Sequence, residues 1–261
     1  DMNLAATGTV TDVLADGTVL GLGHAMFGQG RTALPMATGF VHFVVPRRSV
    51  SFKTAGGLKL RGSLVRDEAS GVTGVREQRY RTAPVKVSVA LPGQQARRYQ
   101  YRVVHHPMLT PVLTSMAVAR SVGAVQKLPM ESALRVEGEL RFTGGRSLTL
   151  DSTLTPASAQ DALIELMPAM TLMMQNPHQR LKLTGAEVKV TVERGIQLAT
   201  LADARLDEVE VHPGQRVSMT LRLQPYGKKV EHRRLSFDVP EELPPGDYQF
   251  VITDSQGYLS R

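Results

Sequence analysis

One histidine of this sequence stands in a context that suits acid–base chemistry. His24 lies in the segment GLGHAMF, directly after an apolar run and within a turn bounded by Gly21, Gly23, Gly28 and Gly30. Imidazole titrates near neutral pH, and a tight loop at the end of a strand is a common position for a general base. The alternative is a histidine that caps a turn or is satisfied in the core, and the residue chemistry alone favours that alternative.

Apart from His24, the sequence contains none of the common site motifs. There is no P-loop, no G-x-G-x-x-G that opens a helix, no H-E-x-x-H and no G-x-S-x-G. The seven histidines show no metal-ligand spacing, and the adjacent His105 and His106 would point to opposite faces of a strand. The absence of cysteine excludes a disulfide scaffold, a cysteine-ligated zinc site and a cysteine nucleophile. We therefore expect neither a metal nor a cofactor.

The composition is that of a folded, basic protein. Of the 261 residues 42% are hydrophobic, and 31 Lys and Arg face 24 Asp and Glu, a net charge of +7. The cationic pairs at 47–48, 97–98, 228–229 and 233–234 are spread along the chain, which indicates solvated faces rather than a nucleic-acid or anionic-surface patch. No nucleic-acid partner is expected. No apolar run is long enough to span a bilayer, and we expect no signal peptide within the chain as it is read from Asp1.

The coarse organisation is mainly β with two accessory helices. Residues 7–105 contain short strand-like runs with frequent turn residues, including hairpins predicted around residues 15–17 and 92–93, which favours a barrel or sandwich. Apolar residues at helical spacing predict helices near 108–127 and 157–176, with a further hairpin around 144–145 between them. Pro168 predicts a kink or break in the second helix.

Alternating strand-like runs in the C-terminal region predict a small β-sandwich-like unit over residues 196–261. Three runs, at 217–223, 235–239 and 248–252, alternate apolar and polar residues. We expect this unit to serve protein contact rather than catalysis. The domain prediction is a β-barrel portion over 1–106, a helix and hairpin segment over 107–195 that belongs to the same domain, and this terminal unit.

The segment around His24 resembles the SpoIVB-type serine peptidases. The resemblance rests on the strand Gly8-Thr9-Val10-Thr11, on the triplet Leu22-Gly23-His24, and further on SFK at 51 and GSLVRDEASGVTG at 62. Longer members of the family also resemble this chain over residues 97–116, RRYQYRVVHHPMLTPVLTSM. The resemblance implies a trypsin-like β-barrel or half-barrel with His24 at its rim, a protein or peptide substrate, and a location in the cell envelope or secreted space.

By this resemblance His24 is the general base that takes a proton from a serine hydroxyl, and Asp67, in the VRDEASG segment, is the candidate for the group that orients it. For Asp67 a turn carboxylate paired with Arg66 or Arg61 remains an alternative. The family's G-x-S-G-S-P nucleophile motif is missing from this chain, and in longer relatives it precedes the histidine segment. Two hypotheses follow: the histidine-bearing portion of a serine endopeptidase, inactive alone and completed by a serine-bearing segment, or a non-catalytic envelope binding or structural module.

Overall fold

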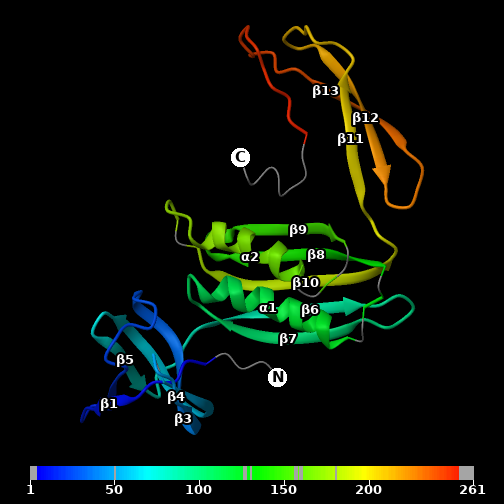
Figure 1. The fold of residues 1–261 in the computed structure, drawn as a ribbon. Coiled ribbons are helices and arrows are strands. Elements are labelled where there is room, and N and C mark those ends of the chain that lie inside the picture. Colours follow the sequence, from blue (N-terminus) through cyan, green and yellow to red (C-terminus); the bar gives the residue numbers. More distant parts are fainter. Residues whose placement is uncertain are drawn as a thin grey trace. The chain divides into compact units, whose positions relative to one another are not determined.

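The computed structural model describes residues 5–49, 51–125, 128–129, 131–155, 158, 161–179 and 181–252, without the side chains of residues 161–165. The chain divides into two compact units, Asp1–Ile196 and Gln197–Arg261. The fold is mainly β, with two helices and three sheets, as the sequence predicts (Figure 1). No sheet closes into a barrel among the residues that the structure describes.

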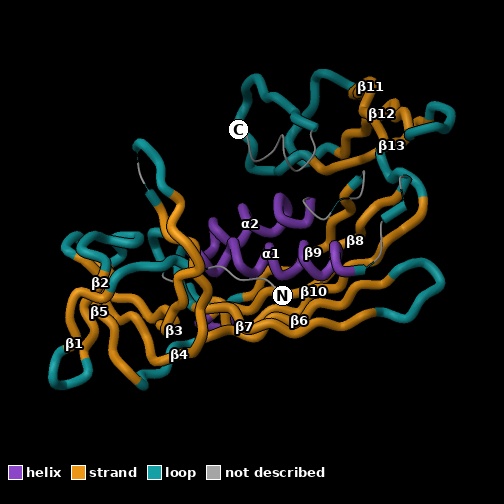
Figure 2. Tube along the Cα trace, turned by 60° about the horizontal axis from the view of Figure 1, so that its bottom comes forward, coloured by secondary structure: helices purple, strands orange, loops and turns teal. Residues whose placement is uncertain are grey.

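The first sheet carries the His24 segment. Its five strands are antiparallel and lie in the order β1-β2-β5-β4-β3. Their bounds are Val10–Val13 for β1, Thr18–Gly21 for β2, Gly30–Val45 for β3, Phe52–Glu68 for β4 and Gly71–Arg76 for β5. Because β3 and β4 are much longer than their neighbours, the hairpin that they form continues past the rest of the sheet (Figure 2).

The predicted hairpin around residues 15–17 is confirmed. Gly17 has φ of 84°, a left-handed conformation that glycine adopts without a steric penalty. The Asp16 carboxylate accepts a hydrogen bond from the Thr18 amide at 2.9 Å, and this bond lowers the pKa of Asp16. The turn thereby places β2, which leads directly into the His24 loop, antiparallel to β1.

The second sheet carries both helices on one face. Its strand order is β7-β6-β10-β8-β9, in which β6 and β10 are parallel and all other pairs are antiparallel. The bounds are Thr82–Ala90 for β6, Arg97–Val104 for β7, Leu109–Ala124 for α1, Ser132–Phe142 for β8, Ser147–Leu154 for β9, Asp161–Met174 for α2 and Leu183–Arg194 for β10, with a 3-10 turn at Thr143–Gly145. Figure 2 shows α1 and α2 side by side over this sheet.

Strand alternation separates the core from a charged outer face. Val85, Val87 and Val89 of β6 are buried with Val188 and Val190 of β10, and together with apolar residues of both helices they form the main core. The residues between them in each strand are largely polar or charged and exposed. Strands β6 and β7 fall within the barrel portion predicted over 1–106, but in the structure they belong to the helix-covered sheet.

Helix α2 runs through Pro168 without a break. Leu166, Met170 and Met174, spaced four residues apart, are all buried. Burial of one such side chain contributes about 1.5–3 kcal/mol. Three of them outweigh the penalty of about 3 kcal/mol for proline in a helix interior.

The C-terminal unit contains one antiparallel sheet of order β11-β12-β13, with bounds Ala199–Leu206, Arg216–Pro225 and Glu231–Asp238. Strands β12 and β13 match two of the three predicted runs. The third run, at 248–252, is outside any strand, although the Phe250 ring stacks on Phe237 with 4.5 Å between centroids. The described residues thus form one sheet, where the sequence suggests a sandwich.

Candidate functional site

The loop that carries His24 connects β2 to β3 and is shaped by left-handed backbone. Leu22, Gly23, Gly28 and Gly30 have φ of 71°, 71°, 67° and 68°. Glycine tolerates this region freely, whereas leucine does so at a steric cost. The Leu22 amide donates a hydrogen bond to the Thr9 carbonyl at 3.0 Å, which helps to hold that residue in place. These turns leave His24 exposed to solvent.

Asp67 holds the same loop through its backbone. This residue is buried, with only 2% of its surface exposed. One carboxylate oxygen accepts the Met26 amide at 2.7 Å, and the other accepts the amides of Phe27 at 2.6 Å and Gly28 at 3.0 Å. Hydrogen bonds to an ionised acceptor are the stronger kind, and three in succession fix the path of the chain directly after His24. The predicted alternative is a pairing of Asp67 with Arg66 or Arg61. Among the described ion pairs Arg66 pairs with Glu68, and neither arginine pairs with Asp67.

The contact of the His24 ring fixes its tautomer. Nδ1 lies 2.8 Å from the Ala25 carbonyl oxygen. A carbonyl oxygen only accepts, so Nδ1 carries the proton of this bond and, in the neutral ring, Nε2 holds the free lone pair. The imidazole is therefore presented as a base at Nε2, with a backbone carbonyl at the position where a carboxylate would stand in a serine-protease triad.

The structure brings the two predicted site residues to one loop without joining their side chains. Both oxygens of Asp67 are occupied by backbone amides, so this carboxylate positions the loop rather than the ring. No described hydrogen bond joins a serine to the His24 ring, whose described contact is the Ala25 carbonyl. Among the described hydrogen bonds, Ser63 donates to the carbonyls of Leu34 and Leu64, and Ser121 bonds to Ala117 and Tyr101.

A second histidine packs against the loop, and no sequence motif singles it out. His106 is buried, and its ring centroid is 5.0 Å from that of Phe27. Its Nδ1 accepts the amides of Met108 and Leu109, both at 3.2 Å, at the start of α1. Burial lowers the pKa of His106, an effect that the Asp67 carboxylate partly opposes. This neutral ring links the His24 loop to the helix-covered sheet.

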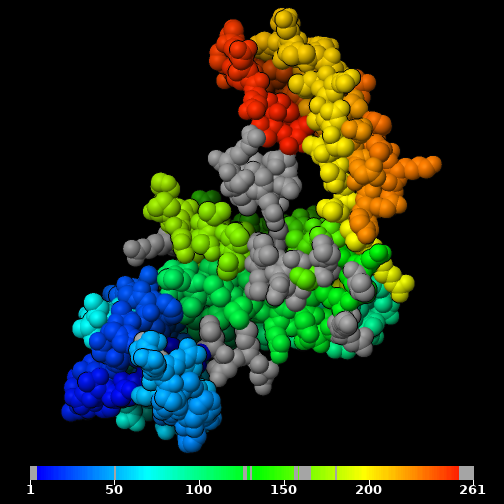
Figure 3. Space-filling view, viewed as in Figure 1, coloured from blue at the N-terminus to red at the C-terminus, as the bar shows by residue number. Residues whose placement is uncertain are grey.

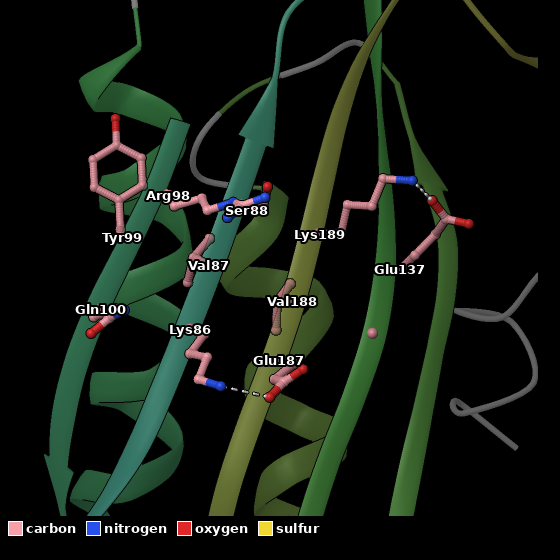
Figure 4. Close-up of a pocket in the computed structure, with 11 residues that line it drawn as sticks. Lys86, Val87, Ser88, Arg98, Tyr99, Gln100, Glu137, Glu187, Val188 and Lys189 are labelled. Carbon is pink, nitrogen blue, oxygen red and sulfur yellow. Dashed lines mark hydrogen bonds and ion pairs between the residues drawn. The ribbon is translucent and has the colours of Figure 1, made fainter. Parts of the chain in front are cut away.

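The outer face of the second sheet forms a shallow trough of about 610 Å³. Its charged side chains pair across neighbouring strands: Lys86 with Glu187 at 3.1 Å and Lys189 with Glu137 at 3.2 Å (Figure 4). Both lysine side chains are 61% exposed, so these pairs contribute little to stability. The trough is thus lined by three cations, Lys86, Arg98 and Lys189, and by two carboxylates, Glu137 and Glu187.

The described residues contain neither a metal-ligand cluster nor a membrane-spanning helix. No group of three or more His, Cys, Asp or Glu side chains there is arranged to hold a metal ion. No described helix combines the length and apolar character needed to cross a bilayer. Comparisons with protein-family models, with curated proteins and with solved structures found no match for this chain.

Proposed function

We propose that this chain is the histidine-bearing portion of a SpoIVB-like serine endopeptidase. His24 acts as the general base, Asp67 positions the loop that presents it, and the nucleophilic serine comes from a segment outside these residues. The substrate is a protein or peptide, and the site of action is the cell envelope or the secreted space. In this proposal the first sheet contributes to a trypsin-like β-barrel or half-barrel that the serine-bearing segment completes.

The observation that carries the proposal is the Asp67–loop contact. A buried carboxylate that accepts three successive amides is a costly way to fix an exposed surface loop. That cost is explained if the loop has to hold His24 in one orientation, with Nε2 free to react.

The chemistry assigned to His24 is proton transfer. Nε2 takes the serine proton as the serine oxygen attacks the peptide carbonyl, and the imidazolium then returns that proton to the leaving amine. Water hydrolyses the resulting acyl-enzyme with the same histidine as base. The Ala25 carbonyl, which accepts from Nδ1, keeps the ring in the tautomer that this sequence of steps needs.

The second candidate is a non-catalytic envelope binding or structural module. It is favoured by one observation: no described carboxylate contacts the His24 ring, and a backbone carbonyl takes that place. A neutral carbonyl stabilises an imidazolium less than a carboxylate does. In this alternative the Asp67–loop contact maintains a surface for partners.

The test compares the 261-residue chain with the same chain extended by its upstream coding sequence. Each is treated with a serine-directed fluorophosphonate probe and analysed by intact mass. We expect no labelling of the shorter chain and stoichiometric labelling of the longer one at a single serine. The variant His24→Ala should slow labelling at least about a thousandfold. The matched control His232→Ala changes an exposed histidine of the C-terminal unit and should label at the unmodified rate.

Three results would contradict the proposal. Labelling of the shorter chain at one of its own serines would show that the nucleophile lies within it. An extension without a Gly-x-Ser-Gly-Ser-Pro motif, or labelling that is indifferent to His24→Ala, would favour the binding module.

A further inference from the structure

The β3–β4 hairpin carries an exposed apolar surface. Strand β5 pairs with β4 only from Gly62 onward, so residues 37–45 and 52–60 form a ribbon of two strands, which we call the arm. Large hydrophobic side chains on the arm face solvent, with Phe43 58% and Leu58 70% exposed. The full set is Phe40, Val41, Phe43, Val44, Phe52, Leu58 and Leu60. In Figure 3 the arm, in light blue, lies open at the surface of its unit.

The arm belongs to a stretch of chain with no acidic residue. Residues 17–66 contain seven Lys and Arg and no Asp or Glu, so this stretch alone accounts for the net charge of +7. The rest of the chain is balanced, with 24 cations and 24 acids. The seven cations are Arg31, Arg47, Arg48, Lys53, Lys59, Arg61 and Arg66. Among the described ion pairs only Arg66 of these seven has an acidic partner, so no described ion pair neutralises a cation of the arm.

Cations and apolar groups lie together at the end of the arm. Arg47 and Arg48 are in the connection between β3 and β4, and both are exposed. The Arg47 guanidinium is 5.1 Å from the centroid of the Phe52 ring. Such a cation over a ring keeps the charge at the edge of the apolar surface, where both can enter one interface.

We propose that the arm docks on the surface of an anionic phospholipid bilayer. Phenylalanine and aliphatic side chains enter the boundary between headgroups and acyl chains, and neighbouring Lys and Arg bind the anionic headgroups. The insertion is superficial, so backbone amides and carbonyls at the edges of the ribbon stay in reach of water and headgroups.

The composition of the arm favours a bilayer over the other occupants. Single-stranded nucleic acid could contact the cations and stack on the rings of Phe40, Phe43 and Phe52. Bases stack on aromatic faces, so such a ligand would leave the exposed Leu58 and Leu60 without a matching contact. A second copy of the chain would bring an equally cationic arm, and like charges oppose such a contact.

The experiment is vesicle co-sedimentation of the whole chain. Vesicles of phosphatidylcholine alone are compared with vesicles that also contain phosphatidylglycerol, at low and at high salt. We expect binding to the anionic vesicles that weakens as salt is raised. Arg47→Glu combined with Arg48→Glu should weaken that binding more than about tenfold, since each cation near the surface contributes about a fivefold factor. Phe40→Ser with Phe43→Ser should weaken it about tenfold or more.

Matched controls use the same changes elsewhere. Leu172→Ser alters an apolar side chain of α2 that is 65% exposed, and Lys228→Glu with Lys229→Glu alters an exposed cationic pair in the turn between β12 and β13. Both control variants should bind anionic vesicles as the unmodified chain does. Far-UV circular dichroism checks that every variant keeps its β content, and the charge variant, which leaves the strand pairing untouched, tests the proposal if the phenylalanine variant does not fold.

Three outcomes would overturn the proposal. Equal binding to neutral and anionic vesicles, or none to either, removes the anionic bilayer as the partner. Binding that the arm variants do not change places the contact elsewhere. Absence of vesicle binding together with arm-dependent binding of a single-stranded oligonucleotide, or with arm-dependent self-association in light scattering, assigns the surface to nucleic acid or to a second copy.

Discussion

Replacing Asp67 by asparagine should release the His24 loop. The carboxylate accepts three amides, at 2.7, 2.6 and 3.0 Å. The asparagine oxygen can take over the pair from Phe27 and Gly28, but its NH₂ group then faces the Met26 amide, donor against donor. One charge-assisted bond, worth about 1.5–3 kcal/mol, is lost, and two others become neutral bonds worth about 1 kcal/mol each. Since the variant no longer buries an ionised group, some of this loss is offset, and we expect a destabilisation of about 2–4 kcal/mol.

The assay combines a global and a local measurement. Urea unfolding followed by far-UV circular dichroism gives the change in free energy, but the two units of the chain need not unfold together. Hydrogen exchange of the amides of residues 26–28 therefore serves as the local measurement, since these are the donors that Asp67 holds. Their protection should fall in Asp67→Asn by more than that of the strand amides of β6 and β10.

The control is the neighbouring acid Glu68, which forms an exposed pair with Arg66 at 3.1 Å. Glu68→Gln removes the same charge one residue away and should change the stability by less than about 0.5 kcal/mol. If Asp67→Asn matched this control in stability, and the amides of 26–28 kept their protection, the carboxylate would not be what holds the loop.

Two further predictions concern the second sheet and its link to the loop. Gly138→Ala should lower the free energy of unfolding in urea by more than about 3 kcal/mol, because a Cβ there would lie 2.2 Å from the Glu187 carbonyl oxygen. In the control Gly185→Ala the nearest contact of the new Cβ would be the flexible end of an arginine at 3.4 Å, so its free energy of unfolding should stay within about 1 kcal/mol of the unmodified chain. Equal effects of the two variants would contradict the packing argument. Burial lowers the pKa of His106 below its usual value of 6.5, and the Asp67 carboxylate partly opposes this shift. As the pH falls below 6.5, the unfolded chain therefore takes up a proton at this histidine before the folded chain does, and the folded state loses stability. His106→Asn, which keeps an acceptor for α1, should flatten the urea midpoint profile over roughly pH 5–7, and an unchanged slope would contradict this assignment.

Local patterns predict the local structure of this chain. The Asp16-Gly17 turn contains the residues that a two-stranded hairpin needs, and β1 and β2 pair across it as expected. The helical spacing after Pro107 corresponds to α1, Leu109–Ala124, and the strand pattern around Gly144 and Gly145 corresponds to β8 and β9. In each case the signal and the contacts lie within a few residues of one another.

Pairings between distant segments cannot be predicted in this way. Strand β6 pairs in parallel with β10, so Val87 lies beside Val188. Hydrophobic periodicity predicts which face of a strand is buried, but it does not predict which other strand will pair with that strand. Sequence order alone therefore groups the segment 82–104 with the strands that precede it, although its apolar face packs under helices that come later.

In the candidate site too, the sequence predicts the kind of residue but not which distant residues it will contact. The glycine-rich context marks His24 as a loop residue, and the structure places it on an exposed loop. That Asp67 contacts backbone amides some forty residues earlier depends on β4 pairing with both β3 and β5, which no local motif encodes. The sequence suggests only that His105 and His106 point to opposite faces of a strand. The burial of His106 against Phe27 arises from contacts between segments about eighty residues apart.

Two features of the first sheet, the loop held by Asp67 and the cationic arm, depend on where acidic and basic residues lie along the chain. Asp67 is the first acidic residue after the long acid-free stretch, and it is buried with both oxygens bound to backbone amides. Its charge is thus used within the loop and is not available on the surface to pair with the cations of the arm. The register places Asp67 opposite Gly30, outside the arm, whose first pair is Ala37 with Leu60. The cations of the arm therefore lack acidic neighbours in the sequence because residues 17–66 contain no Asp or Glu. Asp67 thus fixes the candidate catalytic loop, and the acid-free stretch that it ends supplies the charge that the proposed bilayer contact requires.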